Sequence, residues 1–267
     1  MSEPVLLSEI KDGVLLLTFN RPDRNNGWNI ELEEAYFDAL GEACTNPAVK
    51  VIVITGAGRS FCPGLDMNTL AAASQGTPMT DGKRYPMIYA RLIPKPVIAA
   101  INGACAGIGL IQAVAADVRF AAEGAKFTSS FARRGLHAEH GVAWLLERIV
   151  GLGHTSDLLL SARVLDAEEA EKLGLVNKVF PPDQLLEATL SYAREMAANC
   201  SPMALATIKA QILGDYNRTI YESRRDALDL SISVSSEPDF KEGVNSFREK
   251  RLPNFSGIAR NSGVEKE

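Results

Sequence analysis

Two glycine-rich turns, each placed between a buried strand and a helix, constrain this chain more than any other feature. The first turn, S-F-C-P-G-L-D-M, covers Ser60 to Met67 and follows an apolar, β-branched run from Val49 to Thr55. The second, N-G-A-C-A-G-I-G-L, covers Asn102 to Leu110 and follows a similar run from Val97 to Ile101. Strands that are apolar on both faces are normally buried in a sheet that helices cover. The sequence therefore predicts a helix-covered sheet with two glycine turns at the strand ends.

Glycine allows the backbone to approach a ligand, and the N–H groups at the start of a helix carry partial positive charge. If the two turns converge, they offer a pair of donors to a negative oxygen such as that of an enolate. The competing interpretation is close helix packing on small residues, which is the more common reason for a single glycine-rich turn. Two turns in the same order favour the oxyanion hole.

The rest of the chain alternates strands and helices, which predicts an α/β core. A hairpin is expected from Val5 to Ile10 and from Val14 to Asn20, around a Gly turn, and a helix begins near Asn29. Segment 69–84 is rich in Ala, Ser, Gly and Thr and is interpreted as a mobile border of a ligand pocket. Further helices are expected over 87–93, 107–115, 142–150, 154–161 and 167–173, and further strands over 118–121, around 127 and over 175–180.

After Pro181 and Pro182 only helical patterns follow, over 185–199, 202 to about 235, and 240–250. We therefore expect a core of residues 1–195 and a helical C-terminal region of residues 196–267. The apolar faces of such a tail need a cover, either from its own core or from a neighbouring subunit.

Charge and cysteine content narrow the function class. Lys and Arg number 28 against 33 Asp and Glu, and no block of five like charges occurs, which argues against nucleic acid as a partner. The four cysteines form no CxxC pair, and the N-terminus has no basic and apolar leader, so we expect a cytoplasmic protein with free thiols. The apolar stretch from Val97 to Ala116 is interrupted by glycines and polar residues, so we predict no membrane span.

With these motifs in place, the chain resembles the crotonase (enoyl-CoA hydratase and isomerase) superfamily from about Val5 to Phe255. The likeness rests on several motifs together: N-R-P-D-R-N, V-K-V-I-V-I-T-G, F-C-P-G-L-D, P-K-P-V-I-A-A-I-N-G, A-A-D-V-R-F, L-G-L-V-N-K-V and E-G-V-N-S-F-R-E-K-R-L-P-N-F. The resemblance implies an α/β fold, the ClpP-like spiral of ββα units, with a helical C-terminal trimerisation region. It also implies a homotrimer or a dimer of trimers, a role in fatty acid metabolism, and an acyl-CoA substrate.

The resemblance places the oxyanion hole at the backbone N–H groups of Leu65 and Ile108. Coenzyme A enters as part of the substrate, so no separate cofactor is expected, and no His and Cys cluster or strand-borne GxGxxG predicts a metal or a dinucleotide. Cys62 and Cys105, in the two glycine turns, are interpreted as small packing residues. The residues expected to bind CoA, the last two from a neighbouring subunit, are Arg24, Gly64, Asp66, Phe247 and Lys250.

The sequence departs from the family pattern at the two glutamates that hold a water in the hydratases. The corresponding positions carry Ile111 and Phe131, which transfer no proton and are assigned to the acyl pocket. Glu139, in G-L-H-A-E-H-G, falls where one isomerase branch has its single catalytic glutamate, at the expected start of a helix. Such a base removes a proton from C2 of a 3-enoyl ester and returns it at C4, while the oxyanion hole holds the dienolate. His140 is the candidate to tune or replace it.

The leading hypothesis is therefore isomerisation of a Δ3-enoyl-CoA to the Δ2 ester, with a lyase-type hydration as the rival. Hydration would need a non-standard site, given Ile111 and Phe131. A non-catalytic acyl-CoA-binding paralogue is a second rival, and hydrolysis or C–C cleavage of a β-dicarbonyl through His140 is a third. Glu139 also has an ordinary interpretation, as an exposed acid at a helix N-terminus.

Overall fold

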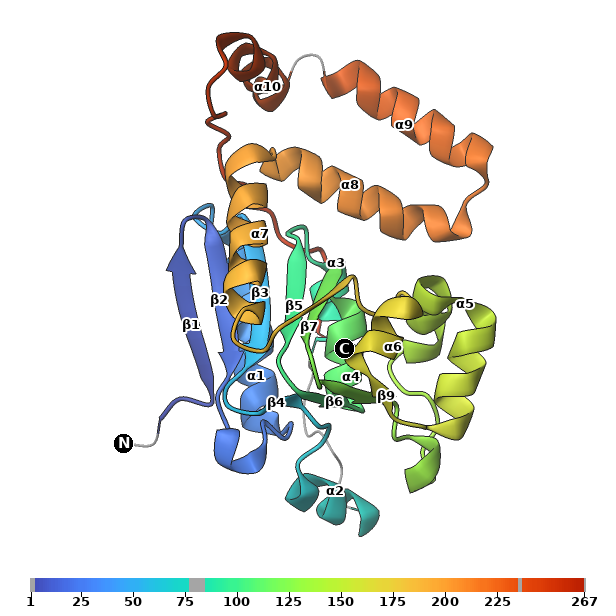
Figure 1. The fold of residues 1–267 in the computed structure, drawn as a ribbon. Helices are drawn as coiled ribbons and strands as arrows, with labels where there is room; N and C mark the ends of the chain where they lie inside the picture. Colours follow the sequence, from blue (N-terminus) through green and yellow to red (C-terminus); the bar gives the residue numbers. More distant parts are fainter. Residues whose placement is uncertain (1–2, 77–84, 235–236, 267) are drawn as a thin grey trace.

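The computed structural model describes residues 3–76, 85–234 and 237–266, and Figure 1 shows their arrangement. The strands are β1 (Leu6–Lys11), β2 (Val14–Phe19), β3 (Val51–Gly56), β4 (Ser60–Cys62), β5 (Val97–Ile101), β6 (Ala104–Ala106), β7 (Val118–Ala122), β8 (Lys126–Thr128), β9 (Leu165–Asp166) and β10 (Lys178–Phe180). The α-helices are α1 (Ile30–Thr45), α2 (Met67–Ser74), α3 (Tyr89–Leu92), α4 (Ile108–Ala115), α5 (Val142–Ser161), α6 (Ala167–Lys172), α7 (Leu185–Asn199), α8 (Pro202–Gly214), α9 (Ile220–Val234) and α10 (Pro238–Glu249).

The buried apolar runs form one large sheet, in the order β1-β2-β3-β5-β7-β10. β1 and β2 pair antiparallel as the predicted hairpin, and every other neighbouring pair in this sheet is parallel. Side chains alternate between its faces, so Ile52 and Ile54 join the core that includes α1 and α4. Val51 and Val53 join a second cluster, against α7. The expected two-sided burial is confirmed.

A small sheet, in the order β4-β6-β8-β9, collects the short strand that follows each of three large-sheet strands. β3 leads to β4, β5 to β6, and β7 to β8, so the chain steps from the large sheet to the small sheet three times. The β4, β6 and β8 strands pair in parallel. This repeated strand, strand and helix unit is the expected α/β spiral.

Helix α4 forms the centre of the spiral, and all eight of its residues are buried. Its second residue, Gly109, allows the closest approach, because a Cβ there would lie 1.9 Å from the carbonyl oxygen of Cys62. The absence of a side chain therefore brings the first turn of α4 against β4, the short strand at the beginning of the first glycine turn.

The structure merges two of the predicted helices and divides a third. The two helices expected over 142–150 and 154–161 are one element, α5, kinked at Gly151, where φ is 79° and ψ is 162°. The helix expected from Pro202 to about Ser235 is two helices, because Asp215–Asn217 forms a 3-10 turn and the Thr219 hydroxyl and the Glu222 carboxylate then cap each other's backbone N–H groups. Its expected end at Ser235 lies outside the described residues.

The segment expected to be mobile, 69–84, begins within α2, and residues 77–84 of it lie outside the described residues. The strand expected over 175–180 is only β10, Lys178–Phe180.

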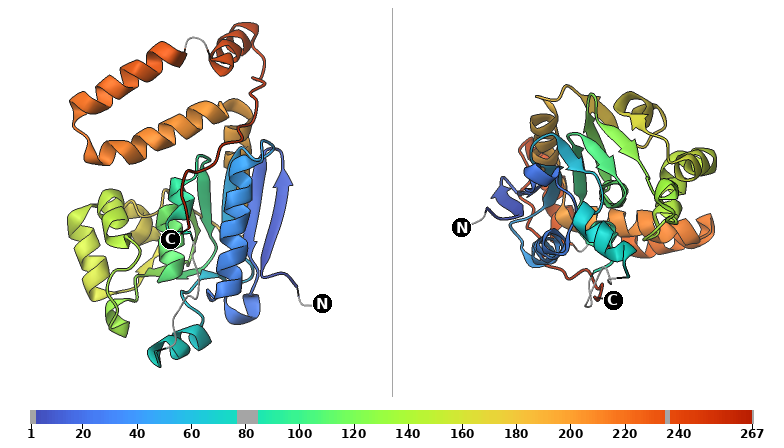
Figure 2. Two further views of the ribbon diagram at one scale, coloured as in Figure 1. Left: turned by 180° about the vertical axis from the view of Figure 1, so that it is seen from behind. Right: turned by 90° about the horizontal axis from the view of Figure 1, so that it is seen from below.

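The C-terminal helices α8, α9 and α10 extend beyond the two sheets, at the top of Figure 1. The boundary expected at residue 195 lies within α7, which covers one face of the large sheet. After α10 the chain runs back along the core, as the view from behind in Figure 2 shows. There the carbonyl of Phe255 accepts from Lys50 Nζ at 3.1 Å, and the N–H of Arg260 donates to the carbonyl of Cys44 at 3.0 Å.

Candidate active site

The first glycine turn leaves β4 and leads directly into α2. Gly64 has φ +106°, a conformation that residues with a side chain rarely adopt. Trp28 fixes the turn from the other side, because its N–H donates to Gly64 O and its carbonyl accepts from the N–H of Asp66, both at 2.8 Å. The N–H of Leu65, which lies between these two contacts in the chain, takes part in neither of them.

The second glycine turn meets the first. A Cβ at Gly107 would lie 3.6 Å from the Cα of Gly64, so the gap between the two turns there is no wider than one Cβ in ordinary contact. Ile108 is the first residue of α4, where backbone N–H groups have no partner within the helix. Among the hydrogen bonds of the described residues, none uses the N–H of Leu65 or of Ile108. The predicted convergence of the two turns is therefore present.

A cavity of about 40 Å³ opens where the turns meet. Both turns contribute to it, and Phe131, Leu136 and Glu139 reach it from the segment between β8 and α5. A second cavity of about 20 Å³ is lined by Leu65, Ile108, Glu139 and His140, together with residues of α1. The carboxyl of Glu139 and the imidazole of His140 thus lie beside both residues whose N–H groups are the expected donors.

Glu139 does not begin a helix as predicted. His140 and Gly141 have φ of +54° and +74°, and two left-handed residues in succession delay α5 until Val142. Glu139 therefore lies in an irregular turn, with its carbonyl accepting the N–H of Val142 at 3.0 Å. The interpretation as a helix-terminal acid is weakened, because the side chain lines both cavities.

The two positions assigned to the acyl pocket differ. Phe131 is 5% exposed and lines the larger cavity, whereas Ile111 is fully buried in α4 and is not among the residues that line either cavity. Neither supplies a proton-transferring group.

The residues expected to bind CoA are not all together. Gly64 lines the cavity. Asp66 accepts a hydrogen bond from Arg21 at 3.0 Å. Burial raises the pKa of Asp66, but the N–H of Asn68 and the Arg21 guanidinium outweigh it and hold the pKa below its usual value. Arg24 is an exposed side chain close to Asp23. Phe247 and Lys250 lie at α10, at the opposite end of the molecule from α2 and β4 (Figure 1).

Sequence reasoning missed Glu33. It is 6% exposed, lines the smaller cavity and accepts a hydrogen bond from Trp28 Nε1 at 2.8 Å. A signal was present, because Glu33 is four residues before Phe37 and seven before Leu40, both on the apolar face of the predicted helix. An acid on a buried face calls for a specific role.

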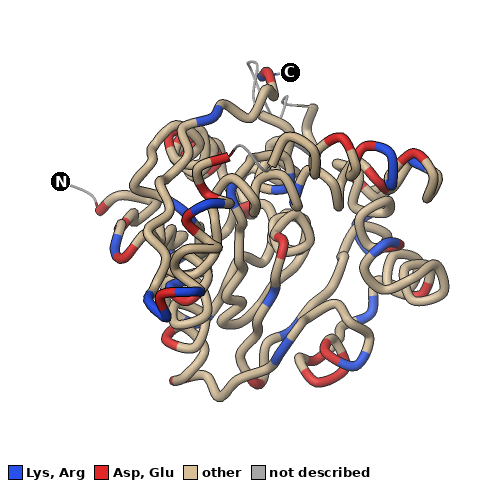
Figure 3. The backbone as a smooth tube through the Cα atoms, turned by 90° about the horizontal axis from the view of Figure 1, so that it is seen from above, with Lys and Arg blue, Asp and Glu red and all other residues tan. Residues whose placement is uncertain are grey.

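The secondary candidates have structural roles. Cys62 and Cys105 are fully buried, which raises the pKa of the Cys62 thiol to about 12 and holds that of Cys105 well above its usual value. The carboxylate of Asp166 accepts from the N–H of Glu169 and caps α6. In the described part of the chain no group of three His, Cys, Asp or Glu residues could hold a metal, and no helix could cross a membrane. Acidic and basic residues are interspersed along the backbone (Figure 3).

The similarity to known proteins covers nearly the whole chain. The family model for enoyl-CoA hydratase/isomerase matches residues 9–258. The 1,2-epoxyphenylacetyl-CoA isomerase of Escherichia coli is 32% identical over 258 residues, which cover 94% of this chain and 98% of that protein. Among solved structures, an enoyl-CoA hydratase EchA12_1 from Mycobacterium marinum is 45% identical, with a TM-score of 0.70 over 81% of this chain and 100% of that one. A probable enoyl-CoA hydratase/isomerase from Mycobacterium abscessus is 29% identical, with a TM-score of 0.86 over 95% of this chain and 99% of that one.

The fold and the matches together define a crotonase-fold enzyme that acts on acyl-CoA thioesters. This chain belongs to the enoyl-CoA hydratase/isomerase family.

Proposed function

We propose that this enzyme isomerises a Δ3-enoyl-CoA to the Δ2 ester through a dienolate, with Glu139 as the single base. The observation that carries this proposal is that Glu139 lines the same cavities as Leu65 and Ile108, while the positions of the two hydratase glutamates are filled by Ile111 and Phe131. Among the described residues, Glu139 is the one carboxyl that lines both cavities, and a thioester oxygen held by the two N–H groups brings C2 next to it.

The reaction needs one base and one oxyanion hole. Glu139 takes the proton from C2, and the electron pair moves into the thioester, where the N–H groups of Leu65 and Ile108 hold the negative oxygen. The carbonyl then re-forms, the double bond shifts to C2 and C3, and the carboxyl returns the proton to C4. No group is added or lost.

The test is turnover of 3-hexenoyl-CoA by the Glu139→Gln variant, followed by mass spectrometry and absorbance of the conjugated ester. We expect turnover to fall at least a hundredfold, because the amide takes no proton, while the Kd for hexanoyl-CoA stays within about threefold. His140→Ala is the companion variant, and it should retain most of the activity. Unchanged turnover in Glu139→Gln would contradict the proposal, and binding without turnover in the unaltered enzyme would favour the non-catalytic paralogue.

Hydration at a non-standard site is the second candidate. It is favoured by the similarity to an enoyl-CoA hydratase from Mycobacterium marinum and by the buried carboxyl of Glu33 in the smaller cavity. A mass gain of one water on crotonyl-CoA distinguishes it from isomerisation.

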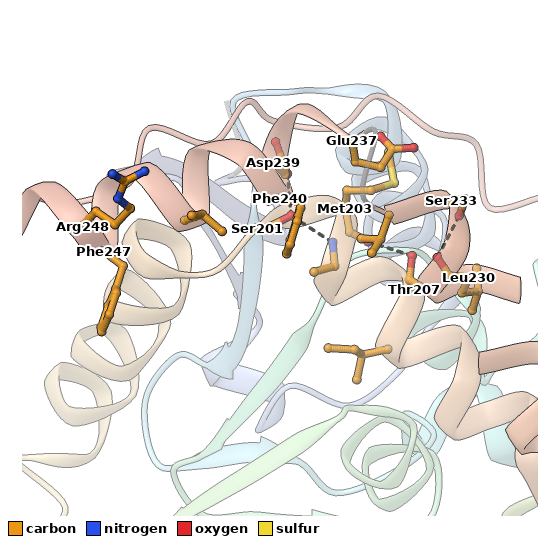
Figure 4. A pocket seen from close by; sticks show the side chains of 15 residues that line it. Ser201, Met203, Thr207, Leu230, Ser233, Glu237, Asp239, Phe240, Phe247 and Arg248 are labelled. Carbon is orange, nitrogen blue, oxygen red and sulfur yellow. Dashed lines mark hydrogen bonds between the residues drawn. The ribbon is translucent and has the colours of Figure 1, made fainter. Parts of the chain in front are cut away.

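We also propose that the enzyme assembles as a trimer or a dimer of trimers, in which a neighbouring subunit supplies Phe247 and Lys250 to the CoA site. An apolar groove of about 790 Å³ between α8, α9 and α10 supports this assembly, and Figure 4 shows Phe240 and Met203 among the side chains that line it. Phe247 is 85% exposed, which is costly for an aromatic ring without a cover. All four cysteines are free thiols, and this supports our proposal of a cytoplasmic location.

A further inference from the structure

The smaller cavity is sized for a single oxygen-bearing group. Its volume of about 20 Å³ is enough for one water, which needs about 10 to 15 Å³ of such space. It shares Leu65, Ile108 and Glu139 with the larger cavity, so a group placed in it lies next to the position of the thioester carbonyl. The other walls combine apolar Ile30 and Met87 with the polar residues Asn29, Glu33, Thr69 and His140.

Glu33 is the buried acid of this cavity, and the fold holds it in one orientation. Trp28 Nε1 donates to Glu33 Oε2 at 2.8 Å. The indole is itself fixed, because it is 1% exposed and packs edge-on against Phe19 and Tyr36, with ring centroids 5.6 Å and 5.7 Å away. The carboxyl that lines the cavity is therefore held in one position, and a hydrogen bond to a buried carboxylate is stronger than one in water.

Stabilisation of the start of α1 does not explain why Glu33 faces the cavity. Acids are favourable in the first turn of a helix, but the capping of α1 is already performed by Asn29, whose side chain accepts from the N–H of Leu32 at 3.0 Å. Glu31 in the same turn is exposed and interacts with the dipole without any cost of burial. Neither function requires an acid on the face that lines the cavity.

We propose that Glu33 is a specificity-determining residue that accepts a hydrogen bond from a hydroxyl held in this cavity. The hydroxyl belongs either to the acyl group, on one of the first carbons after the carbonyl, or to a water molecule. This inference rests on the proposed acyl-CoA site, and it adds the substrate class: acyl groups that bring an O–H to Glu33 are preferred over saturated, unsubstituted ones.

A binding experiment tests whether the hydroxyl comes from the acyl group. Calorimetric titration compares butyryl-CoA with 2-, 3- and 4-hydroxybutyryl-CoA in the unaltered enzyme, where at least one hydroxy ester should bind about tenfold more tightly than butyryl-CoA. In Glu33→Leu this ratio should fall to about one, and in Trp28→Phe it should fall in part, because the carboxyl loses the donor that orients it. Glu34→Gln is the matched control, since Glu34 is the exposed neighbour on the same helix, and its ratio should be unchanged.

An isotope-incorporation experiment tests whether the hydroxyl comes from a water molecule. Crotonyl-CoA is incubated in ¹⁸O-labelled water, where addition breaks one O–H bond of water, forms the C3–O bond and places the proton on C2. Labelled 3-hydroxybutyryl-CoA that forms in the unaltered enzyme and in Glu34→Gln, but not in Glu33→Leu, identifies water as the occupant.

Either a Glu33-dependent preference or Glu33-dependent label supports the inference. Absence of both, or a preference that Glu33→Leu retains, overturns it. Glu33→Gln, which is nearly the same size, provides the folded comparison if the leucine variant fails to bind butyryl-CoA. The isomerase proposal fails separately, through Glu139→Gln turnover of 3-hexenoyl-CoA, so the two failures are distinguishable.

Discussion

Gly109 shows how one missing side chain sets the geometry of the whole site. A Cβ at this position would lie 1.9 Å from the Cys62 carbonyl oxygen and 2.9 Å from the Cys62 Cβ, all within the strand that leads into the first glycine turn. Any side chain would push α4 away from β4. Ile108 is the first residue of α4 and Leu65 lies in the turn that follows β4, so the separation of their N–H groups depends on this contact.

We therefore expect Gly109→Ala to lower the free energy of unfolding by about 3 kcal/mol and to reduce turnover more than a hundredfold. The overlap is with backbone atoms, which have no rotamer to adjust. Urea unfolding and 3-hexenoyl-CoA turnover measure the two effects. Gly153→Ala is the control, because a Cβ at Gly153 in α5 would meet nothing within 4 Å, and its stability should be unchanged or slightly higher. Equal effects of the two substitutions would refute the steric interpretation.

The sequence indicates the site residues that follow local motifs, and it misses those that depend on tertiary approach. The two turns could be located because each combines glycine with a preceding buried strand. Glu33 could not be assigned to the site, because its place depends on how α1 packs against the turn between β4 and α2. The same reason hides the Arg21 and Asp66 ion pair, whose partners are 45 residues apart.

At the scale of elements, Lys209 joins the C-terminal helices to the core. Its Nζ, on α8, donates to the carbonyls of Ala90 and Lys95, each at 2.9 Å, and to Asp117 Oδ2 at 2.7 Å. The side chain is 9% exposed, and its ammonium satisfies acceptors from α3, the following turn and the loop before β7. One cation thus closes the contact between α8 and the large sheet.

Lys209→Met should remove about 3 kcal/mol from the free energy of unfolding, because it leaves two buried carbonyls and Asp117 without this donor. Hydrogen exchange in α8 should accelerate more than exchange in α4. Urea unfolding and exchange mass spectrometry provide the measurements. Lys241→Met, at an exposed position on α10, is the matched control and should change stability by less than about 0.5 kcal/mol. Uniform exchange changes in both helices would contradict a local anchor.

Lys95 gives the fold a specific pH dependence. Its Nζ donates to the carbonyl of Asn46 at 2.6 Å, and burial lowers its pKa from 10.5 to about 8. The unfolded chain therefore holds this proton more tightly than the folded one, so below pH 8 the full cost of burying the charge is present. The cost declines as pH rises from about 8 to 10.5, and this contribution makes the fold more stable over that range. Comparing Tm for the unaltered chain and Lys95→Met at pH 7.5 and 9.5 should show the unaltered chain gaining on the variant, and a constant difference would refute the assignment.

The long elements could be predicted, whereas of the four short strands in the small sheet only the one around residue 127 could. Strands β3 and β5 and helices α4 and α7 carry apolar patterns that extend over several residues, and their predicted bounds agree with the structure to within two residues. For α1 the sequence predicts only the start, near Asn29, and this agrees too. The small sheet is made of strands of two or three residues, too short to show a period. The break between α8 and α9 comes just before the capping pair of Thr219 and Glu222 at the start of α9. The apolar pattern on both sides of the break outweighed this local signal.

At the scale of the whole molecule, the C-terminal helices expose more apolar surface than one chain can cover. The exposed residues come from all three helices and include aromatic rings: Ile208, Ile212, Ile220, Tyr221, Leu228, Ile232, Phe240, Val244 and Phe247. Helix α9 has no buried residue, although helices are stabilised mainly by packing of an apolar face. The arrangement fits a region that completes its packing against other copies of the chain.

The proposed assembly predicts that a charge in the groove separates the subunits. Phe240→Lys, in the wall that Figure 4 shows, puts an ammonium into a surface that assembly would bury, at a cost that exceeds the contribution of any single apolar contact. We expect sedimentation velocity to show a trimer or hexamer for the unaltered chain and a mass near 28.8 kDa for the variant. Affinity for hexanoyl-CoA should fall about tenfold in the variant, because Phe247 and Lys250 of a neighbouring subunit would no longer reach the CoA site. Leu160→Lys is the control, since Leu160 is 79% exposed on α5, away from the groove, and should alter neither mass nor affinity. A monomeric unaltered chain would contradict the assembly, and a monomeric variant with full affinity would contradict a CoA site shared between subunits.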